Sequence, residues 1–343
     1  MAYLVTGGTG FVGSYIVRDL LNEGKEVVCM QRSGVNPIFR EIVGEENVDK
    51  AVMIQGDISN TLQVFNVIKD NNIEVIIHLS SLLSASGSLS SETDPAYALQ
   101  VNGIGMNNML EAARLFGLRK VIWTSTGQVF GPINKYYNEP MGDDDVFYMP
   151  DTMYGATKAL GEFMSKLYFD KFGVDSICLR MGFTLGIGKI HGKSGVFTNF
   201  LKNMATDTPT VMAVADAEIV RAFSYIENLS DLVVKSCEMP TTRKRLFNSI
   251  EFQCSMRQLV ETMCEVNPNA KVTIKDGVAT EEATLGGSPE PELNTTGVFD
   301  ELKWKLKYNR EKHFQLLSQA EWVAVTLMGD TSKYNYSDEA KGY

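Results

Sequence analysis

Two residues, Tyr154 and Lys158, have the types and the spacing that acid–base chemistry needs. They are four positions apart in a segment with helical character, so both side chains fall on one helical face, within reach of each other and of a shared ligand. A phenol titrates near 10 in water, and an ammonium about 5 Å away at an effective dielectric of about 20 favours the phenolate by roughly 3 kcal/mol, or about two pKa units. Alone, such a pair is more often surface decoration, so its meaning depends on the neighbouring motifs.

A glycine-rich stretch near the start of the chain, TGGTGFVG over residues 6–13, joins the apolar run 3–5 to a segment with helical periodicity. Glycines at positions 7, 10 and 13 let the backbone turn tightly and let a pyrophosphate approach the N–H groups at a helix N-terminus. They also let that helix pack closely on the strand. The pattern predicts a dinucleotide-binding turn, and the alternative is a glycine turn without a ligand.

Apolar runs of strand length alternate with helical patterns over the first half of the chain. We expect strands at 27–30, 52–55, 75–79, 120–124 and 175–180, and helices at 14–23, 62–69, 98–116 and 153–172. Strands that are apolar on both faces and separated by helices indicate a parallel sheet covered on both sides. The expected fold class is therefore α/β, with a Rossmann-type doubly wound parallel sheet.

From about residue 182 glycines and polar residues interrupt shorter elements, which indicates a smaller lobe. We expect a helix at 196–205, a return to the sheet near 222–226 and 246–249, and helices at 256–266 and 311–327. The dinucleotide-binding domain then comprises residues 1–181 and about 220–250, and the C-terminal substrate-binding lobe comprises 182–219 and 251–328. Residues 329–343 are polar and are expected to form a flexible tail.

The composition narrows the class of protein. The chain has 343 residues, of which 44% are hydrophobic and 22% charged, as in one large or two closely joined globular domains. Its five cysteines form no CxxC pair and its three histidines are scattered, so we expect reduced thiols and no metal site. The net charge of −10 argues against nucleic acid as a partner. With neither a membrane span nor a signal peptide apparent, we expect a cytoplasmic protein that binds a small molecule and no membrane.

Candidate site residues follow the strands, because ligands bind outside the carboxyl ends of the strands in an open parallel sheet. Asp57 and Ile58 follow the strand expected at 52–55, and Thr126 follows the strand expected at 120–124. Leu79, Ser80 and Ser81 come at the end of the strand expected at 75–79.

In their order along the chain, these motifs resemble the extended short-chain dehydrogenase/reductase family of the epimerase/dehydratase type. TGGTGFVG matches the cofactor turn of that family, GDI at 56–58 its adenine-side motif, and HLSS at 78–81 its central strand. Asn102 matches the asparagine that follows, and TSTGQVFG at 124–131 and YGATK at 154–158 complete the set.

The resemblance implies roles for individual residues. Tyr154 would be the general acid/base, Lys158 would hold the nicotinamide ribose and keep the tyrosine acidic, and Thr126 would hydrogen-bond the substrate oxygen. Asn102 would order the site. The implied cofactor contacts are Gly7, Gly10, Phe11, Val12, Gln31, Arg32, Asp57, Ile58, Leu79, Ser80, Ser81, Asn102, Tyr154, Lys158 and Met181.

The resemblance predicts an NAD(P)-dependent oxidoreductase that transfers a hydride between the nicotinamide and a small polar hydroxy or keto substrate. Segments 78–88, 129–132 and 153–158 are most similar to the threonine dehydrogenases of the family, whereas 181–186 and 220–226 are more similar to its sugar-modifying members.

The main alternative is a nucleotide-sugar epimerase that uses the same site with a tightly held cofactor. Epimerases of the family usually carry asparagine where Phe183 stands, and sugar dehydratases carry an Asp-Glu pair where Gly127 and Gln128 stand. A non-catalytic cofactor sensor is the third candidate, and such proteins tend to lose the Tyr-Lys pair.

The residues at the end of the strand expected at 27–30 bear on the choice of cofactor. It holds Gln31 and Arg32, with no carboxylate to repel a phosphate and with a guanidinium to pair with one, so NADP is expected. Gln31 can instead hydrogen-bond a free ribose, which leaves NAD as the alternative.

Substrate contacts are expected at Ser84, Ser86, Thr126, Tyr154, Thr184 and Arg221. The guanidinium of Arg221 suits a substrate carboxylate, and a structural ion pair is the equally open alternative. We also expect a homodimer, through the apolar helices around 102–116 and 153–172.

Overall fold

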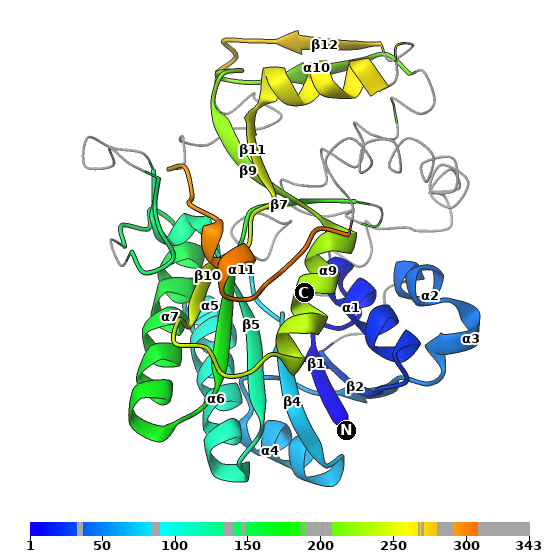
Figure 1. Cartoon of the computed structure of the whole chain (residues 1–343), viewed down its shortest axis with the longest axis vertical. Coiled ribbons are helices and arrows are strands. Elements are labelled where there is room, and N and C mark those ends of the chain that lie inside the picture. The colour runs from blue at the N-terminus through cyan, green and yellow to red at the C-terminus, as the bar shows by residue number, and fades with distance from the viewer. Residues whose placement is uncertain are drawn as a thin grey trace.

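The computed structural model describes residues 1–32, 37–83, 90–132, 140–145, 148–186, 188, 203, 208–266, 268, 271–279 and 291–307. Within them, seven strands pair into one parallel sheet in the order β10-β6-β5-β4-β1-β2-β3 (Figure 1). These strands are β1 (Ala2–Thr6), β2 (Glu26–Gln31), β3 (Val52–Gln55), β4 (Ile73–His78), β5 (Lys120–Thr126), β6 (Ser176–Met181) and β10 (Leu246–Asn248). The chain runs outward from β1 to β3 and then restarts at β4 in the other direction. This is the doubly wound Rossmann-type topology, so the predicted fold class is confirmed.

The sheet is covered on both faces, as the alternation of side chains along β1 shows. Tyr3 and Val5 belong to a core shared with α1 (Phe11–Asn22) and α9 (Ile226–Glu238), whereas Leu4 belongs to a second core on the opposite face. The helices on that second face are α4 (Thr61–Asp70), α6 (Gly105–Phe116) and α7 (Met153–Phe172). The short helices α2 (Pro37–Val43) and α3 (Glu45–Val48) extend the first core.

The helix expected over 98–116 consists of three consecutive pieces. It starts earlier, as α5 (Pro95–Ala98), because Asp94 caps it by accepting a hydrogen bond from the Tyr97 N–H at 2.9 Å. A single wider turn of π-helix, η1 (Leu99–Ile104), then leads into α6. Such turns are frequent at functional sites, and this one carries the buried Asn102.

The helix α7 has the bounds that the sequence predicts. It begins at Met153 because the Thr152 hydroxyl accepts a hydrogen bond from the Gly155 N–H at 3.0 Å. It ends at Gly173, which has the left-handed φ of 70° that glycine adopts without strain.

A smaller lobe lies beyond the carboxyl ends of the main strands (Figure 1). Its three-stranded sheet consists of β7 (Phe183–Leu185), β9 (Val220–Tyr225) and β11 (Phe252–Ser255), and a two-stranded sheet consists of β8 (Thr210–Ala213) and β12 (Val272–Lys275). Helix α10 (Met256–Val266), the short turn η2 (Gly127–Val129) and α11 (Thr296–Asp300) complete the described elements.

The expected return of 222–226 to the main sheet is wrong, whereas 246–249 does return, as β10. Segment 222–226 falls on β9, which pairs in parallel with β7 and antiparallel with β11. Its backbone comes so close to the main sheet at Gly182 that a Cβ there would lie 2.4 Å from the Ala222 carbonyl oxygen. The expected helices 196–205 (except residue 203) and 311–327, and the tail 329–343, lie outside the described residues.

Candidate active site

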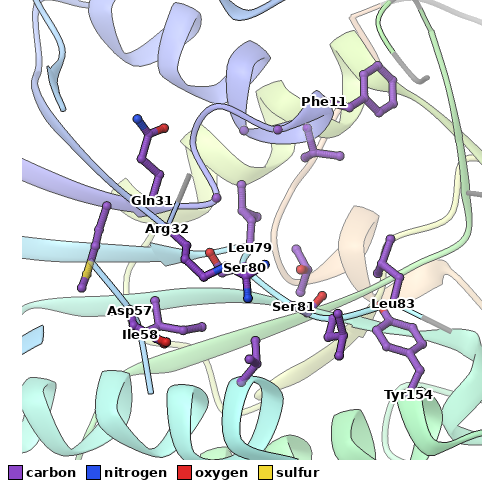
Figure 2. A pocket seen from close by; sticks show the side chains of 18 of the residues that line it. Phe11, Gln31, Arg32, Asp57, Ile58, Leu79, Ser80, Ser81, Leu83 and Tyr154 are labelled. Carbon is purple, nitrogen blue, oxygen red and sulfur yellow. The ribbon is translucent and has the colours of Figure 1, made fainter. Parts of the chain in front are cut away.

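A cavity of about 380 Å³ opens where the strand order reverses, at the carboxyl ends of β1, β2 and β4. Thirteen of the expected site residues line it: Gly7, Gly10, Phe11, Val12, Gln31, Arg32, Asp57, Ile58, Leu79, Ser80, Ser81, Tyr154 and Met181. Gln31 and Arg32 lie at one end of the cavity and Tyr154 lies at the other (Figure 2). The long shape suits an extended ligand.

The glycine turn lines one side of this cavity through Gly7, Gly10 and Gly13. Gly7 has φ +70°, and a Cβ at Gly13 would lie 2.2 Å from the Gly7 carbonyl oxygen, so larger residues at these two positions would force the turn open. Gly10, which precedes α1, has no side chain that could cap the helix. No side chain at Gly10 therefore covers the N-terminus of α1, and the positive end of a helix dipole suits an anion such as a diphosphate.

Tyr154 lies on the first turn of α7 with its ring at the cavity. Burial raises the pKa of Tyr154 to about 12, while a hydrogen bond with the Ser81 side chain acts in the opposite direction. The expected downward shift of the Tyr154 pKa by Lys158 is therefore wrong, because the net shift is upward. Desolvation of the phenolate outweighs every attractive contact, a cost that sequence spacing does not reveal.

Lys158 lies one helical turn further along α7 and is buried beneath the cavity rather than in its lining. Its ammonium donates a hydrogen bond to the Thr124 carbonyl at 2.7 Å and lies 5.7 Å from the centre of the Tyr154 ring. Burial lowers the pKa of Lys158 to about 8. The amine of Lys158 therefore changes its charge near pH 8, close to neutral pH.

His78 lies at the end of β4 and interacts electrostatically with Lys158. It is buried, its Nδ1 lies 2.7 Å from the Thr6 hydroxyl, and burial lowers its pKa to about 3 with a further effect of Lys158. At neutral pH it is an uncharged hydrogen-bonding link between β1 and β4.

Thr126 ends β5, which is two residues longer than expected, and its hydroxyl accepts a hydrogen bond from the Gln128 N–H at 3.3 Å. It is nearly buried and does not line the cavity, although Thr124 does. The Gln128 side chain in turn accepts from the Thr152 hydroxyl at 3.3 Å, which ties the end of β5 to the start of α7.

Sequence reasoning missed Glu92, which meets the N-terminus of α7. Its carboxylate accepts hydrogen bonds from the backbone N–H groups of Met153, at 2.9 Å, and Tyr154, at 3.3 Å. A negative charge is favoured at a helix N-terminus, and here it fixes the backbone of Tyr154 itself. No pattern in the sequence connects two positions so far apart.

Asn102 orders the site instead of lining the cavity. Its side-chain oxygen accepts from the Leu82 N–H at 2.7 Å, and its amide donates to the Leu82 carbonyl and to the Thr157 hydroxyl, both at 3.0 Å. These bonds use both amide protons, so the residue links the segment after β4 to α7.

The other end of the cavity is built from the ends of β2 and β3. The Gln31 side-chain oxygen is buried and has no hydrogen-bond partner. Arg32 donates a hydrogen bond to the hydroxyl of Tyr97, a cavity residue that the sequence analysis did not single out. Asp57 accepts hydrogen bonds at 2.8 Å from both the N–H and the hydroxyl of Ser59, which fixes the turn after β3.

The expected substrate residues are divided between the two lobes. Thr184 on β7 and Arg221 on β9 are both buried, and neither lines the cavity. Arg221 faces Cys254 across the antiparallel pair of β9 and β11. Ser84 and Ser86 lie outside the described residues.

Two general properties can be checked over the described part of the chain. None of its helices combines the length and the apolar character needed to cross a membrane. Nor do the same residues include three or more His, Cys, Asp or Glu side chains grouped so that they could hold a metal ion.

Comparison with known proteins places this site in a context. Residues 3–248 match the model of the NAD dependent epimerase/dehydratase family. The UDP-glucose 4-epimerase of Mycolicibacterium smegmatis is 29% identical over 238 residues, which cover 69% of this chain and 73% of that protein.

Two solved structures are similar in fold. The L-threonine dehydrogenase of Clostridium difficile superposes with a TM-score of 0.79 at 22% identity, covering 96% of this chain and 98% of the other. The UDP-glucose 4-epimerase of Thermotoga maritima, solved with UDP-glucose, has a TM-score of 0.78 at 23% identity, covering 95% and 100%. At these identities the likeness establishes the fold alone.

Proposed function

This chain belongs to the NAD-dependent epimerase/dehydratase family, and from that premise we propose that it is a dehydrogenase or reductase acting on a small polar hydroxy or keto compound. The motifs of the sequence predicted this family. The observation that carries the proposal is the position of the Tyr154 phenol, which lies in the same cavity as the glycine turn, hydrogen-bonded to Ser81 and with Lys158 beneath it.

The cavity fits a dinucleotide in its chemistry. The N-terminus of α1, which has no capping side chain, suits the diphosphate, and the unpartnered oxygen of Gln31 suits a ribose hydroxyl, which can donate to it. When bound, the nicotinamide supplies the acceptor or donor of hydride.

The residues of the chain handle the proton. In the oxidative direction Tyr154, as phenolate, takes the proton of the substrate hydroxyl while Ser81 hydrogen-bonds the phenol oxygen. In this proposal the Lys158 ammonium favours the phenolate and would donate to the nicotinamide ribose, and Thr126 would orient the substrate oxygen. Burial raises the pKa of Tyr154, and the charge of a cationic nicotinamide would offset part of this rise.

We propose NAD as the cofactor, the alternative left open by the sequence. Arg32, the residue expected to pair with the 2′-phosphate of NADP, donates instead to Tyr97. The buried oxygen of Gln31 needs a donor, and a phosphate offers none at neutral pH.

For the substrate, we propose that Ser84, Ser86, Thr126, Tyr154, Thr184 and Arg221 surround it, with residues 182–219 and 251–328 as the substrate-binding lobe, to which β9 also belongs. The second candidate function, nucleotide-sugar epimerase, is favoured by the similarity to the Mycolicibacterium enzyme. Against it, the position where such enzymes usually carry asparagine holds Phe183, whose ring packs 5.9 Å from that of Phe223.

The test is a spectrophotometric screen of the purified protein with NAD and with hydroxy amino acids, hydroxy acids, polyols and nucleotide sugars. Net reduction of NAD by a small hydroxy compound supports the proposal. Isomerisation of a nucleotide sugar without net reduction establishes the epimerase instead, and binding of NAD without turnover of any compound indicates a sensor.

We further propose that the protein is a homodimer through the outer face of α7 and the adjoining turn η1. Large apolar side chains are exposed there: Leu99, Ile104, Leu160, Phe163 and Leu167. Exposed apolar side chains that gather on adjoining helices mark an interaction surface, and a second copy of the chain presents the same surface.

A further inference from the structure

Tyr97 holds Arg32 at the end of the cavity opposite Tyr154. The Arg32 guanidinium donates a hydrogen bond to the Tyr97 hydroxyl and lies 5.4 Å from the centre of its ring. Tyr97 is itself fixed, because its backbone N–H donates to the Asp94 carboxylate at 2.9 Å at the start of α5. The backbone of Arg32 is held by Gln55, whose amide donates to the Arg32 carbonyl at 3.2 Å. The pair therefore bridges the end of β2 and α5.

Gln31 precedes Arg32 in the sequence and lines the same end of the cavity (Figure 2). Its side-chain oxygen is buried and lacks a donor. A buried acceptor without a partner is costly, and a ribose hydroxyl would remove the cost. A 2′-phosphate would place negative charge beside this oxygen and, at neutral pH, would offer it no donor.

We propose that Tyr97 sets the cofactor preference of this enzyme by holding Arg32 against its ring and hydroxyl, so that Arg32 covers the adenosine ribose and does not pair with a 2′-phosphate. Gln31 then accepts a hydrogen bond from a ribose hydroxyl, and NAD is preferred over NADP. This inference rests on the proposed function, because it concerns how the same cavity holds its dinucleotide.

The proposal explains why a guanidinium at the end of β2 does not select NADP here. Pairing with a 2′-phosphate uses the planar fork of the guanidinium in a bidentate arrangement. In this structure that plane lies at the Tyr97 ring, and one of its N–H groups is engaged by the hydroxyl. A 2′-phosphate would have to draw Arg32 away from the tyrosine, and the buried oxygen of Gln31 could not donate to it.

The experiment measures dissociation constants of NADH and NADPH by fluorescence titration for the wild type, Tyr97→Leu, Tyr97→Phe and the double variant Tyr97→Leu with Arg32→Ala. Tyr168→Leu serves as the matched control, because that tyrosine lies on α7 with its hydroxyl on Asn107 and Glu111, outside the cavity lining. Thermal unfolding of each variant shows that it is folded.

We expect the wild type to prefer NADH by about tenfold or more, and Tyr97→Leu to raise the NADPH affinity by about fivefold while weakening NADH. The gain should vanish in the double variant, because it needs the released Arg32. Tyr97→Phe, which keeps the ring and loses the hydroxyl, should fall between the wild type and Tyr97→Leu, and Tyr168→Leu should leave both constants unchanged.

A preference unchanged by Tyr97→Leu overturns the inference. So does a loss of NADPH affinity in that variant, because it would show that Tyr97 presents Arg32 to the phosphate. If the wild type binds neither dinucleotide, the proposed function itself fails, and this inference fails with it. The two failures are thus distinguished by the wild-type titration alone.

Discussion

The two faces of α7 reverse the polarity of an ordinary surface helix, because the inner face is polar and the outer face is apolar. The face toward the sheet buries polar and small residues: Gly155, Thr157, Lys158, Ala159, Gly161, Glu162 and Ser165. The face away from the sheet exposes apolar ones: Leu160, Phe163, Leu167 and Phe172. An ordinary surface helix buries its apolar stripe. The reversal indicates that the inner face of α7 is built for polar chemistry, and it supports a second copy as the cover of the outer face.

Two charged residues on the inner face, Lys158 and Glu162, differ in their bonding partners although they are one helical turn apart. Glu162 has a full set of partners: Arg180 at 2.8 Å, the Ser125 hydroxyl at 2.5 Å and the Tyr148 hydroxyl at 2.6 Å. Lys158 has a backbone carbonyl and no carboxylate within bonding distance among its described contacts, and burial lowers its pKa to about 8. A compensated charge supports structure, whereas an uncompensated charge next to a cavity is suited to a ligand.

The largest expected effect comes from removing the phenol at the start of this face. Tyr154→Phe should lower turnover by about 10²–10⁴-fold, the usual contribution of a positioned general acid/base, because only the hydroxyl is lost. The dissociation constant of NADH should change little. Steady-state rates and fluorescence titration check the two parts, and a variant that retains more than a tenth of the wild-type activity would refute the role of Tyr154.

The second prediction concerns the compensated charge. Arg180→Met leaves the Glu162 carboxylate buried without its cation, since both side chains are fully buried, and should lower the free energy of unfolding by about 3–5 kcal/mol. Urea unfolding measures this difference. The control is Arg114→Met, which breaks the partly exposed pair of Arg114 with Glu111 and should cost about 1 kcal/mol or less. Equal losses in the two variants would contradict the distinction.

The third prediction concerns the outer face. Leu167→Glu places a charge among the apolar side chains of α7 and should convert a dimer into a monomer at micromolar concentration, measured by light scattering. Leu62→Glu is the matched control, because Leu62 is an even more exposed leucine on α4. A wild type that is already monomeric would reject the dimer.

The sequence predicted the elements of the main sheet to within one or two residues, because their signals are local. The bounds of α7 follow from its periodicity, from Thr152 before it and from Gly173 after it. The placement of β9 could not be predicted in this way. A strand pattern in the sequence does not indicate which strands it pairs with. The two partners of β9 are β7, which lies far before it in the sequence, and β11, which follows it after a helix and β10.

The same limit applied to the site. The glycine turn and the Tyr154–Lys158 spacing are short-range patterns, and the cavity contains or adjoins both. Tyr97 and Glu92 gain their roles only when α5 and the segment before it fold against β2 and α7. The pKa of Tyr154 was predicted in the wrong direction, since the spacing describes the distance to a charge and not the loss of water.

The smallest expected effect is a pH dependence of NADH affinity, which tests whether Lys158, unlike Glu162, interacts with a ligand. Because burial lowers the pKa of Lys158 to about 8, its amine is charged below that pH and neutral above it. A charged donor binds ribose hydroxyls more strongly than a neutral one, so NADH affinity should fall by about three- to tenfold as the pH rises from about 6.5 to about 9.5. His78, with a pKa lowered to about 3, stays neutral over this range, and Tyr154, with a pKa raised to about 12, stays protonated. Lys158→Arg keeps its charge at every pH in the range and should give a flat profile, as should the weaker-binding Lys158→Met. If the fall in affinity persists in Lys158→Met, another group titrates, and Lys158 is not the residue that holds the cofactor.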